Sequence, residues 1–482
     1  MTDFRPIVMV VGILLTVLAV AMCLPAAVDA LGKHRDWQVF ALSAAVTLFA
    51  GVSMTLASRS GGRRLDVRQT FMLTTVGWLA LTAFAALPFA FSELNLSYTD
   101  AFFEAMSGVT TTGATVITGL DRAPPGILLW RGILQWLGGI GIIVMAIAVL
   151  PMLRIGGMQL FRMENSDRSE RALPRAAQIA TAIGGIYVAI TLVLTIGYWM
   201  AGMNGLEAVV HAMTTISTGG FSTADASLAH FDSPAIDAIA TVGMIAGALP
   251  FITYLRTLRG DKRALIQDTQ VPFFLGTAGC FALITVGWLW LQADLDLLSA
   301  LRLGTLNVVS MMTGTGYASA AFDTWGSFAM PMFMILMMIG GCAGSTTCGI
   351  KIFRFQVLYA AARSQMHHLL QPHGVFIPYY NRRPISDEVI VSVLSFFFLF
   401  GISLAIIALG LGMLGLDFVT SVSGAVAAVA NVGPGLGPVI GPAGTYQTLP
   451  DAAKWLLSGG MLLGRLELFT VLVMLTRGFW RG

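Results

Sequence analysis

Residues 206–223 read LEAVVHAMTTISTGGFST: about a dozen residues with helical spacing of apolar side chains, then a short run of Ser, Thr and Gly. Three other segments have the same form: AFFEAMSGVTTTGATV (101–116), RLGTLNVVSMMTGTGYAS (302–319) and FVTSVSGAVAAVANVGPGLGP (418–438). A dozen helical residues cross only about half of a bilayer, at roughly 1.5 Å per residue. Four copies of one pattern along one chain predict internal repeats.

The composition around these segments is that of a membrane protein. Of the 482 residues, 56% are apolar and 11% are charged, whereas a soluble domain carries about 25% charged residues. This excludes an ordinary soluble enzyme. The net charge of +3 does not suggest a nucleic-acid partner. The four Cys have no spacing typical of a disulfide framework or a zinc site.

Ten stretches are long and apolar enough to cross a bilayer. They lie at about 7–31, 37–57, 69–91, 126–150, 176–201, 234–257, 271–292, 328–361, 388–415 and 452–476. With the N-terminus inside, most of the 28 Lys and Arg residues fall on cytoplasmic links, so the positive-inside rule places both termini in the cytoplasm. The outer links are correspondingly acidic. This either attracts cations or merely reflects the scarcity of Lys and Arg there.

Each of the four segments lies between two of spans three to ten, and these two spans run in opposite directions. The segment therefore enters and leaves on the outer side, as a re-entrant loop whose backbone must line a path or be buried in protein. We predict an all-α polytopic membrane protein: two leading transmembrane helices plus four parallel helix, pore-loop, helix repeats around a pseudo-fourfold pore. The predicted divisions are 1–68 for the leading helices, then 69–175, 176–270, 271–387 (with an intramembrane gating loop) and 388–482 for the repeats.

Four such loops around one axis supply rings of backbone carbonyls, which can replace the water shell of a monovalent cation. Aligned on their shared pattern, the segments superpose Gly113, Gly219, Gly316 and Gly433. A single glycine in a membrane protein usually serves helix packing, but four in register, each after a half-helix, favour a carbonyl-lined filter. The predicted filter residues are Thr111, Thr112, Gly113, Ser217, Thr218, Gly219, Gly314, Thr315, Gly316, Asn431, Val432 and Gly433.

Span eight is too long for one crossing, and its middle reads GGCAGSTTCG. Each interior Gly costs a helix about 1 kcal/mol, so we expect the helix to break and the loop to line the cavity below the filter. The loop comprises Gly340, Gly341, Cys342, Ala343, Gly344, Ser345, Thr346, Thr347, Cys348 and Gly349. GSTTCGIK at 344–351 imitates a phosphate-binding loop, but no strand precedes it and no Ser or Thr follows the Lys.

Arg465 lies in the middle of span ten. A charge at that depth is costly and by default functional, so we expect Arg465 to face the cation path as part of a gate. The alternative is a structural ion pair with Glu467, although a residue two positions on lies on another helical face.

Other polar residues have structural interpretations. We expect Glu104 and Glu207 to support their half-helices, with attraction of ions as the alternative, and His211 and Asn307 to be satisfied packing residues. His367, His368 and His373 are expected in a solvated loop, with metal binding as the alternative. No complete catalytic motif occurs, so we expect no enzymatic activity.

The motifs TTTGAT (110–115), STGGFST (217–223), TGTGY (313–317) and NVGPG (431–435), together with GGCAGSTTCGIK (340–351), resemble the TrkH-type members of the Trk/Ktr/HKT potassium transporter superfamily. The resemblance covers essentially the whole chain. It implies a potassium-selective subunit that conducts K⁺ inward across a bacterial inner membrane, without an organic cofactor. Glycine at all four filter positions implies K⁺ rather than Na⁺.

The resemblance also implies that Arg465 and the Gly-rich loop form the constriction below the filter. It further implies a homodimer and a cytosolic regulatory ring subunit that binds nucleotides. The basic links 154–175 and 351–383 are suited to docking such a regulator. The alternative function is a secondary transporter coupled to H⁺ or Na⁺ with alternating access, which would require midplane ion-pairing groups and inverted repeats.

Overall fold

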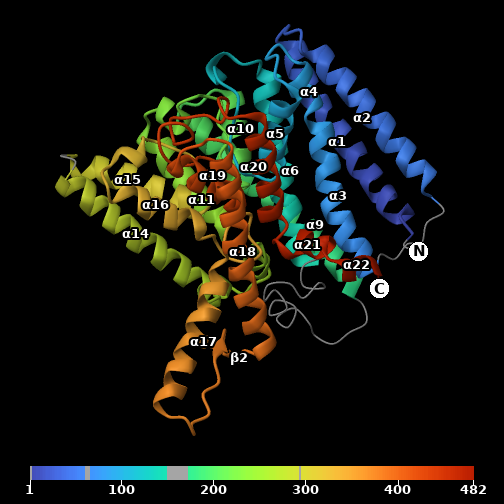
Figure 1. Ribbon diagram of the computed structural model, residues 1–482. Helices are drawn as coiled ribbons and strands as arrows, with labels where there is room; N and C mark the ends of the chain where they lie inside the picture. The colour runs from blue at the N-terminus through green and yellow to red at the C-terminus, as the bar shows by residue number, and fades with distance from the viewer. Residues whose placement is uncertain (1–2, 60–65, 149–171, 293–294, 482) are drawn as a thin grey trace.

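The computed structural model describes residues 3–59, 66–148, 172–292 and 295–481. Within these ranges the chain is mostly helical, with one two-stranded hairpin (Figure 1). Seven of the described helices are long and apolar enough to cross a membrane, and two further pairs of helices each form a sharply bent span. The predicted all-α membrane architecture is therefore confirmed.

The two leading helices, α1 (Arg5–Leu31) and α2 (Trp37–Ala57), pack tightly side by side at one edge of the molecule (Figure 1). Their contact depends on Gly12 and Gly51, because a Cβ on either glycine would collide with the backbone of the other helix. Small residues at a helix crossing are the usual means by which membrane helices approach closely.

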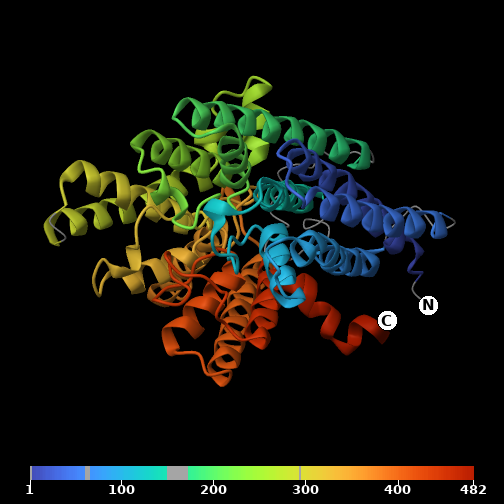
Figure 2. The same ribbon diagram turned by 90° about the horizontal axis from the view of Figure 1, so that it is seen from above.

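The remaining described helices form four groups in chain order. They are α3 (Val67–Ala85), α4 (Leu87–Phe91), α5 (Tyr98–Val109) and α6 (Pro125–Ala148); α9 (Ala172–Met200), α10 (Gly205–Ile216), α11 (Pro234–Ala248), α12 (Phe251–Leu258) and α13 (Ala264–Gln267); α14 (Gln270–Gln292), α15 (Leu297–Met312), α16 (Ala329–Met338) and α17 (Ile352–Leu370); and α18 (Asp387–Met413), α19 (Phe418–Ala430), α20 (Asp451–Arg465), α21 (Phe469–Leu472) and α22 (Arg477–Arg481). Seen from above, the groups follow one another around the centre of the molecule (Figure 2).

Each group contains one short helix: α5, α10, α15 or α19. All four short helices begin at a residue whose side chain accepts a hydrogen bond from the first turn, namely Ser97, Asn204, Asp296 or Asp417. Such N-caps start a helix at a defined residue. In α10, Glu207 completes a capping box with Asn204, so the predicted helix-supporting role of Glu207 is confirmed.

Two predicted spans are not continuous helices. Span 234–257 turns by 90° between α11 and α12, where Leu249 is extended and Pro250 begins the new direction. Proline disfavours helical geometry in the residue before it, which accounts for the break. Span 452–476 turns by 107° after Arg465, where Glu467 and Leu468 have φ of 60° and 53°. Both stretches are therefore spans with a sharp bend, which the apolar length alone did not predict.

Span eight has the predicted break: α16 ends at Met338 and α17 begins at Ile352. The far half of α17 extends beyond the other helices, beside the hairpin of β1 (Tyr379–Tyr380) and β2 (Arg383–Pro384) (Figure 1). Most of the predicted docking link 154–175 lies outside the described residues.

Candidate functional site

The four loops that follow the short helices have the same backbone conformation. Each first places a residue in the left-handed region, with φ of 53° at Thr111, 49° at Thr218, 71° at Gly314 and 52° at Asn431. Two residues later each loop has a glycine with positive φ. These are Gly113 (87°), Gly220 (77°), Gly316 (82°) and Gly433 (99°). The repeated conformation defines which residues of the four loops are equivalent.

This equivalence corrects the predicted alignment in the second loop. The N–H of Gly219 donates to the carbonyl five residues back, at Thr214, just as Thr112 donates to Ser107. Gly219 is therefore the counterpart of Thr112, Thr315 and Val432, and Gly220 is the counterpart of Gly113. The structural counterparts of Thr111, Thr112 and Gly113 are therefore Thr218, Gly219 and Gly220. Each lies one residue later than the predicted Ser217, Thr218 and Gly219. Two adjacent glycines look alike in sequence, and only the sign of φ separates them.

The four glycines bring the loops together backbone against backbone. A Cβ on Gly113 would fall on the carbonyl of Gly219, and one on Gly220 would fall on that of Thr315. In the same way Gly316 faces the carbonyl of Val432, and Gly433 faces that of Thr112. Each loop thus contacts the next in chain order, and the fourth contacts the first.

A small cavity of about 70 Å³ lies at this meeting point, and all four loops line it, through Gly113, Gly220, Gly316 and Pro434 among others. Phe221, Tyr446 and Asp225 belong to the same lining. The threonines just below are fully buried: Thr112 and Thr315 have no exposed surface. The closed set of contacts therefore surrounds one common point.

In three of the loops, a polar side chain nine residues before the positive-φ glycine forms a hydrogen bond with the segment that follows this glycine. In the first loop the Glu104 carboxylate accepts from the Val116 N–H at 2.9 Å. In the second, His211 Nε2 lies 3.0 Å from Ser222 Oγ. In the third, Asn307 Nδ2 donates to Ser319 Oγ at 2.9 Å. His211 and Asn307 are thus satisfied polar residues, as predicted.

The fourth loop departs from this rule. The equivalent residue is Gly424, and the neighbouring Ser423 Oγ instead accepts from the Leu436 N–H at 3.0 Å. The prediction for Glu104 also needs correction, because its carboxylate supports the loop and pairs with Arg131 at 2.8 Å. Arg131 also donates to the Ser222 carbonyl at 2.6 Å, so this buried pair joins the first and second loops.

Sequence reasoning missed Arg131 and two further supporting residues, Gln135 and Tyr446. Gln135, one helical turn after Arg131 on α6, donates to the Gly219 carbonyl and accepts from Phe221 N–H. The Tyr446 hydroxyl donates to the Gly433 carbonyl at 2.7 Å. Polar residues four apart in the apolar span of α6 were the available signal for Arg131 and Gln135.

The Gly-rich loop lies below the second loop and is bound by many hydrogen bonds. Thr346 Oγ1 donates to the carbonyls of Ile216, at the end of α10, and Gly247, at the break of span six. Thr218 Oγ1 donates to Thr346 Oγ1 at 3.2 Å. The Cys342 N–H donates to the Ala248 carbonyl. Two broken spans thus satisfy one another's free backbone groups, as burial inside a membrane requires.

Arg465 is 1% exposed and lies against this loop. Its Nη1 donates to Cys348 Sγ at 2.6 Å and to the Thr346 carbonyl at 3.3 Å. Its Nη2 donates to the Gly138 carbonyl of α6 at 2.7 Å. The alternative ion pair with Glu467 was wrong, because Glu467 pairs with Arg354 of α17 instead.

Three basic side chains lie close together next to the Gly-rich loop. Within the described ranges, Arg354, Lys351 and Arg465 are all buried in this cluster, and Glu467 lies beside them. Lys351 donates to the carbonyl and hydroxyl of Thr347 in the Gly-rich loop.

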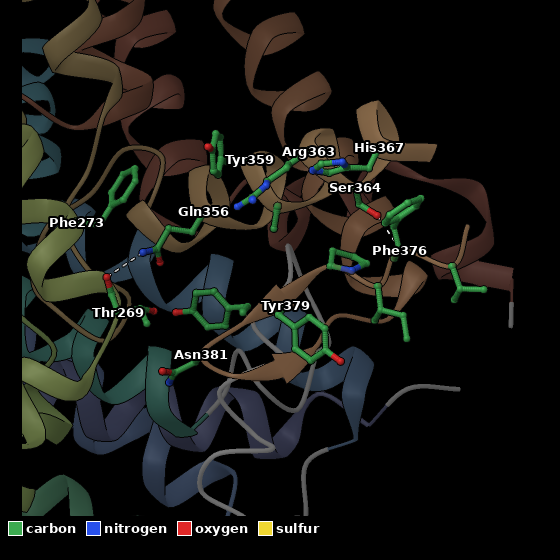
Figure 3. A pocket seen from close by; sticks show the side chains of 15 residues that line it. Thr269, Phe273, Gln356, Tyr359, Arg363, Ser364, His367, Phe376, Tyr379 and Asn381 are labelled. Atoms are coloured by element: carbon green, nitrogen blue, oxygen red, sulfur yellow. Dashed lines mark hydrogen bonds between the residues drawn. The ribbon is translucent and has the colours of Figure 1, made fainter. Parts of the chain in front are cut away.

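A larger groove of about 630 Å³ lies along α17, and none of the residues of the four glycine loops lines it. Figure 3 shows Arg363 and His367 of α17 on one side, with Tyr379 and Asn381 of the hairpin segment below them. No carboxylate lines this groove. His367 stacks on Phe376, and among the described residues no group of three or more His, Cys, Asp or Glu side chains could hold a metal ion.

Three comparisons with known proteins agree with one another. Residues 36–477 match the family model TrkH, described as cation transport protein. The chain is 46% identical to the Trk system potassium uptake protein TrkI of Halomonas elongata, over 99% of this chain and 97% of that protein. It is 35% identical to the Trk system potassium uptake protein TrkH of Escherichia coli K12, over 99% of both. The crystal structure of the potassium transporter TrkH from Vibrio parahaemolyticus superposes with a TM-score of 0.92 at 34% identity, covering all of both chains.

Proposed function

Because this chain belongs to the TrkH family of cation transport proteins, we propose that it takes up K⁺ into the cytoplasm through the point where its four loops meet. The relatives at 46% and 35% identity are potassium uptake proteins by name. A filter of backbone carbonyls would bind the dehydrated ion without any carboxylate. The proposed filter residues are the glycines Gly113, Gly220, Gly316 and Gly433 with the two residues before each.

The observation that carries this proposal is the closed set of backbone contacts among the four glycine loops. The four short helices all end at these loops. Their carboxyl-terminal ends each carry about half a negative charge, which favours a cation beneath the loops. Low symmetry is expected at the fourth loop, where Val432 stands at the position of Thr112 and Thr315 and Pro434 follows the glycine.

We further propose that the Gly-rich loop and Arg465 close this path on the cytoplasmic side. The guanidinium holds the loop through Thr346 and Cys348 and opposes a cation electrostatically. Conduction then requires the loop, Arg465 or both to move. The chain would act as a homodimer in a bacterial inner membrane, with both termini in the cytoplasm. The exposed end of α17, with its groove, would dock a cytosolic nucleotide-binding regulator.

The test is ion permeability of the purified protein in liposomes. Gly113→Ser should lower the K⁺/Na⁺ permeability ratio by about tenfold or more, because the added atoms collide with the Gly219 carbonyl and one displaced coordinating group is worth roughly 1.4 kcal/mol or more. Gly276→Ser on α14 is the matched control, since a Cβ there meets nothing within 4 Å.

An unchanged ratio in Gly113→Ser would refute the filter assignment. Uptake strictly coupled to H⁺ or Na⁺ and insensitive to all four glycines would instead support alternating access.

A further inference from the structure

The bend in span ten separates two charged side chains that point to different partners. Arg465 is the last residue of α20 and contacts the Gly-rich loop and α6. Glu467, two residues later, forms an ion pair with Arg354 of α17. Only Leu466 separates them. The chain bends at Glu467 and Leu468, whose φ angles are 60° and 53°. The bend is fastened to the end of α20, because the Glu467 N–H donates to the Gly464 carbonyl at 3.2 Å and the Leu468 N–H donates to the Leu463 carbonyl at 2.9 Å. Arg465 and Glu467 are therefore joined by a short, stiff connection.

The Arg354–Glu467 pair is held firmly on the side of α17 as well. Arg354 has no exposed surface, and its guanidinium lies 3.6 Å from the ring centroid of Phe396 on α18. Glu467 is 8% exposed. A buried ion pair of this kind resists separation, because parting the two groups leaves a charge unpaired away from water.

Arg354 lies in the first turn of α17, directly after the Gly-rich loop. At this same end of the helix, the Ile352 N–H donates to the Gly341 carbonyl, and Lys351 donates to Thr347. The start of α17 therefore holds both parts of the proposed gate: the loop directly, and Arg465 through Glu467. The other end of α17, about 24 Å away at Leu370, projects from the molecule (Figure 1).

We infer that the Arg354–Glu467 pair is the link through which the position of α17 sets the position of Arg465. A displacement of α17 draws Glu467 with it, and the stiff bend passes this movement to the guanidinium that closes the path. Arg354 and Glu467 are thus positioning residues that never touch the ion. This inference rests on the proposed gate and adds the means by which the exposed end of α17 controls it.

The first test uses K⁺ flux in liposomes with Glu467→Gln and Arg354→Gln. Each should raise the flux of the isolated protein by about tenfold, since a coupling of this size is typical between two linked sites. The K⁺/Na⁺ ratio should stay at the wild-type value, because the filter is untouched. Arg256→Gln is the control, since it removes a charge from an exposed ion pair with Asp261.

The second test reads the gate directly through Cys348, which Arg465 covers. The exposed Cys23 and Cys280 are first replaced by Ser, and a water-soluble methanethiosulfonate reagent is then applied. Glu467→Gln should speed modification of Cys348 by about tenfold and leave the fully buried Cys342 unmodified. Combining Arg354→Glu with Glu467→Arg restores the pair with reversed charges and should return flux and modification rate toward wild type.

The outcomes distinguish a failure of the Arg354–Glu467 link from a failure of the proposed ion path. Raised flux with an unchanged Cys348 rate, or single variants that fold and behave as wild type, would overturn the link. If a single variant does not fold, the charge-reversed double variant takes its place in the test. It should show wild-type K⁺ flux and slow modification of Cys348. High flux together with fast modification in the folded double variant would also overturn the link. A failed filter test with an accelerated Cys348 reaction would leave the link standing and refute the proposed ion path.

Discussion

At the scale of residues, the four loops depend on backbone positions that only certain side chains tolerate. Gly220 has a φ of 77°, and a Cβ there would fall on the carbonyl of Thr315. Gly219 has no positive φ, and a Cβ there would meet the amide of Gln135 instead. The two neighbouring glycines therefore perform different tasks. One makes the contact between loops, and the other makes room for a supporting side chain.

This difference predicts unequal effects of the same substitution. Gly220→Ala should abolish K⁺ selectivity, because the left-handed conformation alone costs an L-residue about 1–2 kcal/mol and the new methyl displaces the neighbouring loop. Gly219→Ala should be milder, since the Gln135 side chain can shift. The K⁺/Na⁺ permeability ratios of the two variants, measured in liposomes, test this prediction. A more severe defect in Gly219→Ala would restore the alignment that the sequence suggested.

The buried Glu104–Arg131 pair predicts a loss of stability. Glu104→Gln keeps the shape of the side chain but leaves a buried guanidinium without its anion, which costs about 3–5 kcal/mol. Glu207→Gln in the equivalent short helix should change little, because Gln also completes a capping box. The unfolding temperatures of the two variants in detergent measure these changes in stability. Equal unfolding temperatures for the two variants would contradict the role of the pair.

At the scale of elements, broken helices supply the binding partners of one another. The break between α11 and α12 frees the carbonyls of Gly247 and Ala248, and the loop between α16 and α17 supplies the N–H groups of Thr346 and Cys342 that bind them. Neither break would be tolerable alone inside a membrane. The Gly-rich loop therefore keeps a defined shape although its own sequence does not impose one.

Thr346 connects these elements through its hydroxyl, which leads to a further prediction. Thr346→Val keeps the volume but leaves the buried Ile216 carbonyl without this donor, at a cost of about 1–3 kcal/mol, while the Gly247 carbonyl keeps the N–H of residue 346. We expect higher basal K⁺ flux with unchanged selectivity. Thr277→Val is the control, because that hydroxyl bonds only within its own helix. Reduced or unchanged flux would show that Thr346 does not hold the loop closed.

At the scale of the whole molecule, four similar groups surround one centre while the two leading helices lie at the edge (Figure 2). Outward-facing apolar side chains such as Phe49, Leu283 and Phe398 are 67–76% exposed, as expected for surfaces in contact with lipid. The distribution of Lys and Arg then sets which end of the molecule faces the cytoplasm.

Orientation can be tested with fusions. Alkaline phosphatase joined after Asn95, between α4 and α5, should be active because that segment is expected outside. The same enzyme joined after Lys262, between α12 and α13, should be inactive, and green fluorescent protein at the C-terminus should fluoresce. The opposite pattern at any of the three positions would refute the predicted topology.

The helical membrane architecture, the four short helices and the break after Met338 were accessible from the amino-acid order, because apolar length, helical period and clustered Gly are local properties. Glu104 illustrates the limit: its place in a short helix was evident, but its partners Val116 and Arg131 were not. Likewise the choice of Gly220 over Gly219, the bend after Arg465 and the pairing of Glu467 with Arg354 emerged only from the folded chain. Each depends on a backbone angle or on contacts between segments far apart in the sequence. The interactions that stabilise these features form only when the distant segments have packed together.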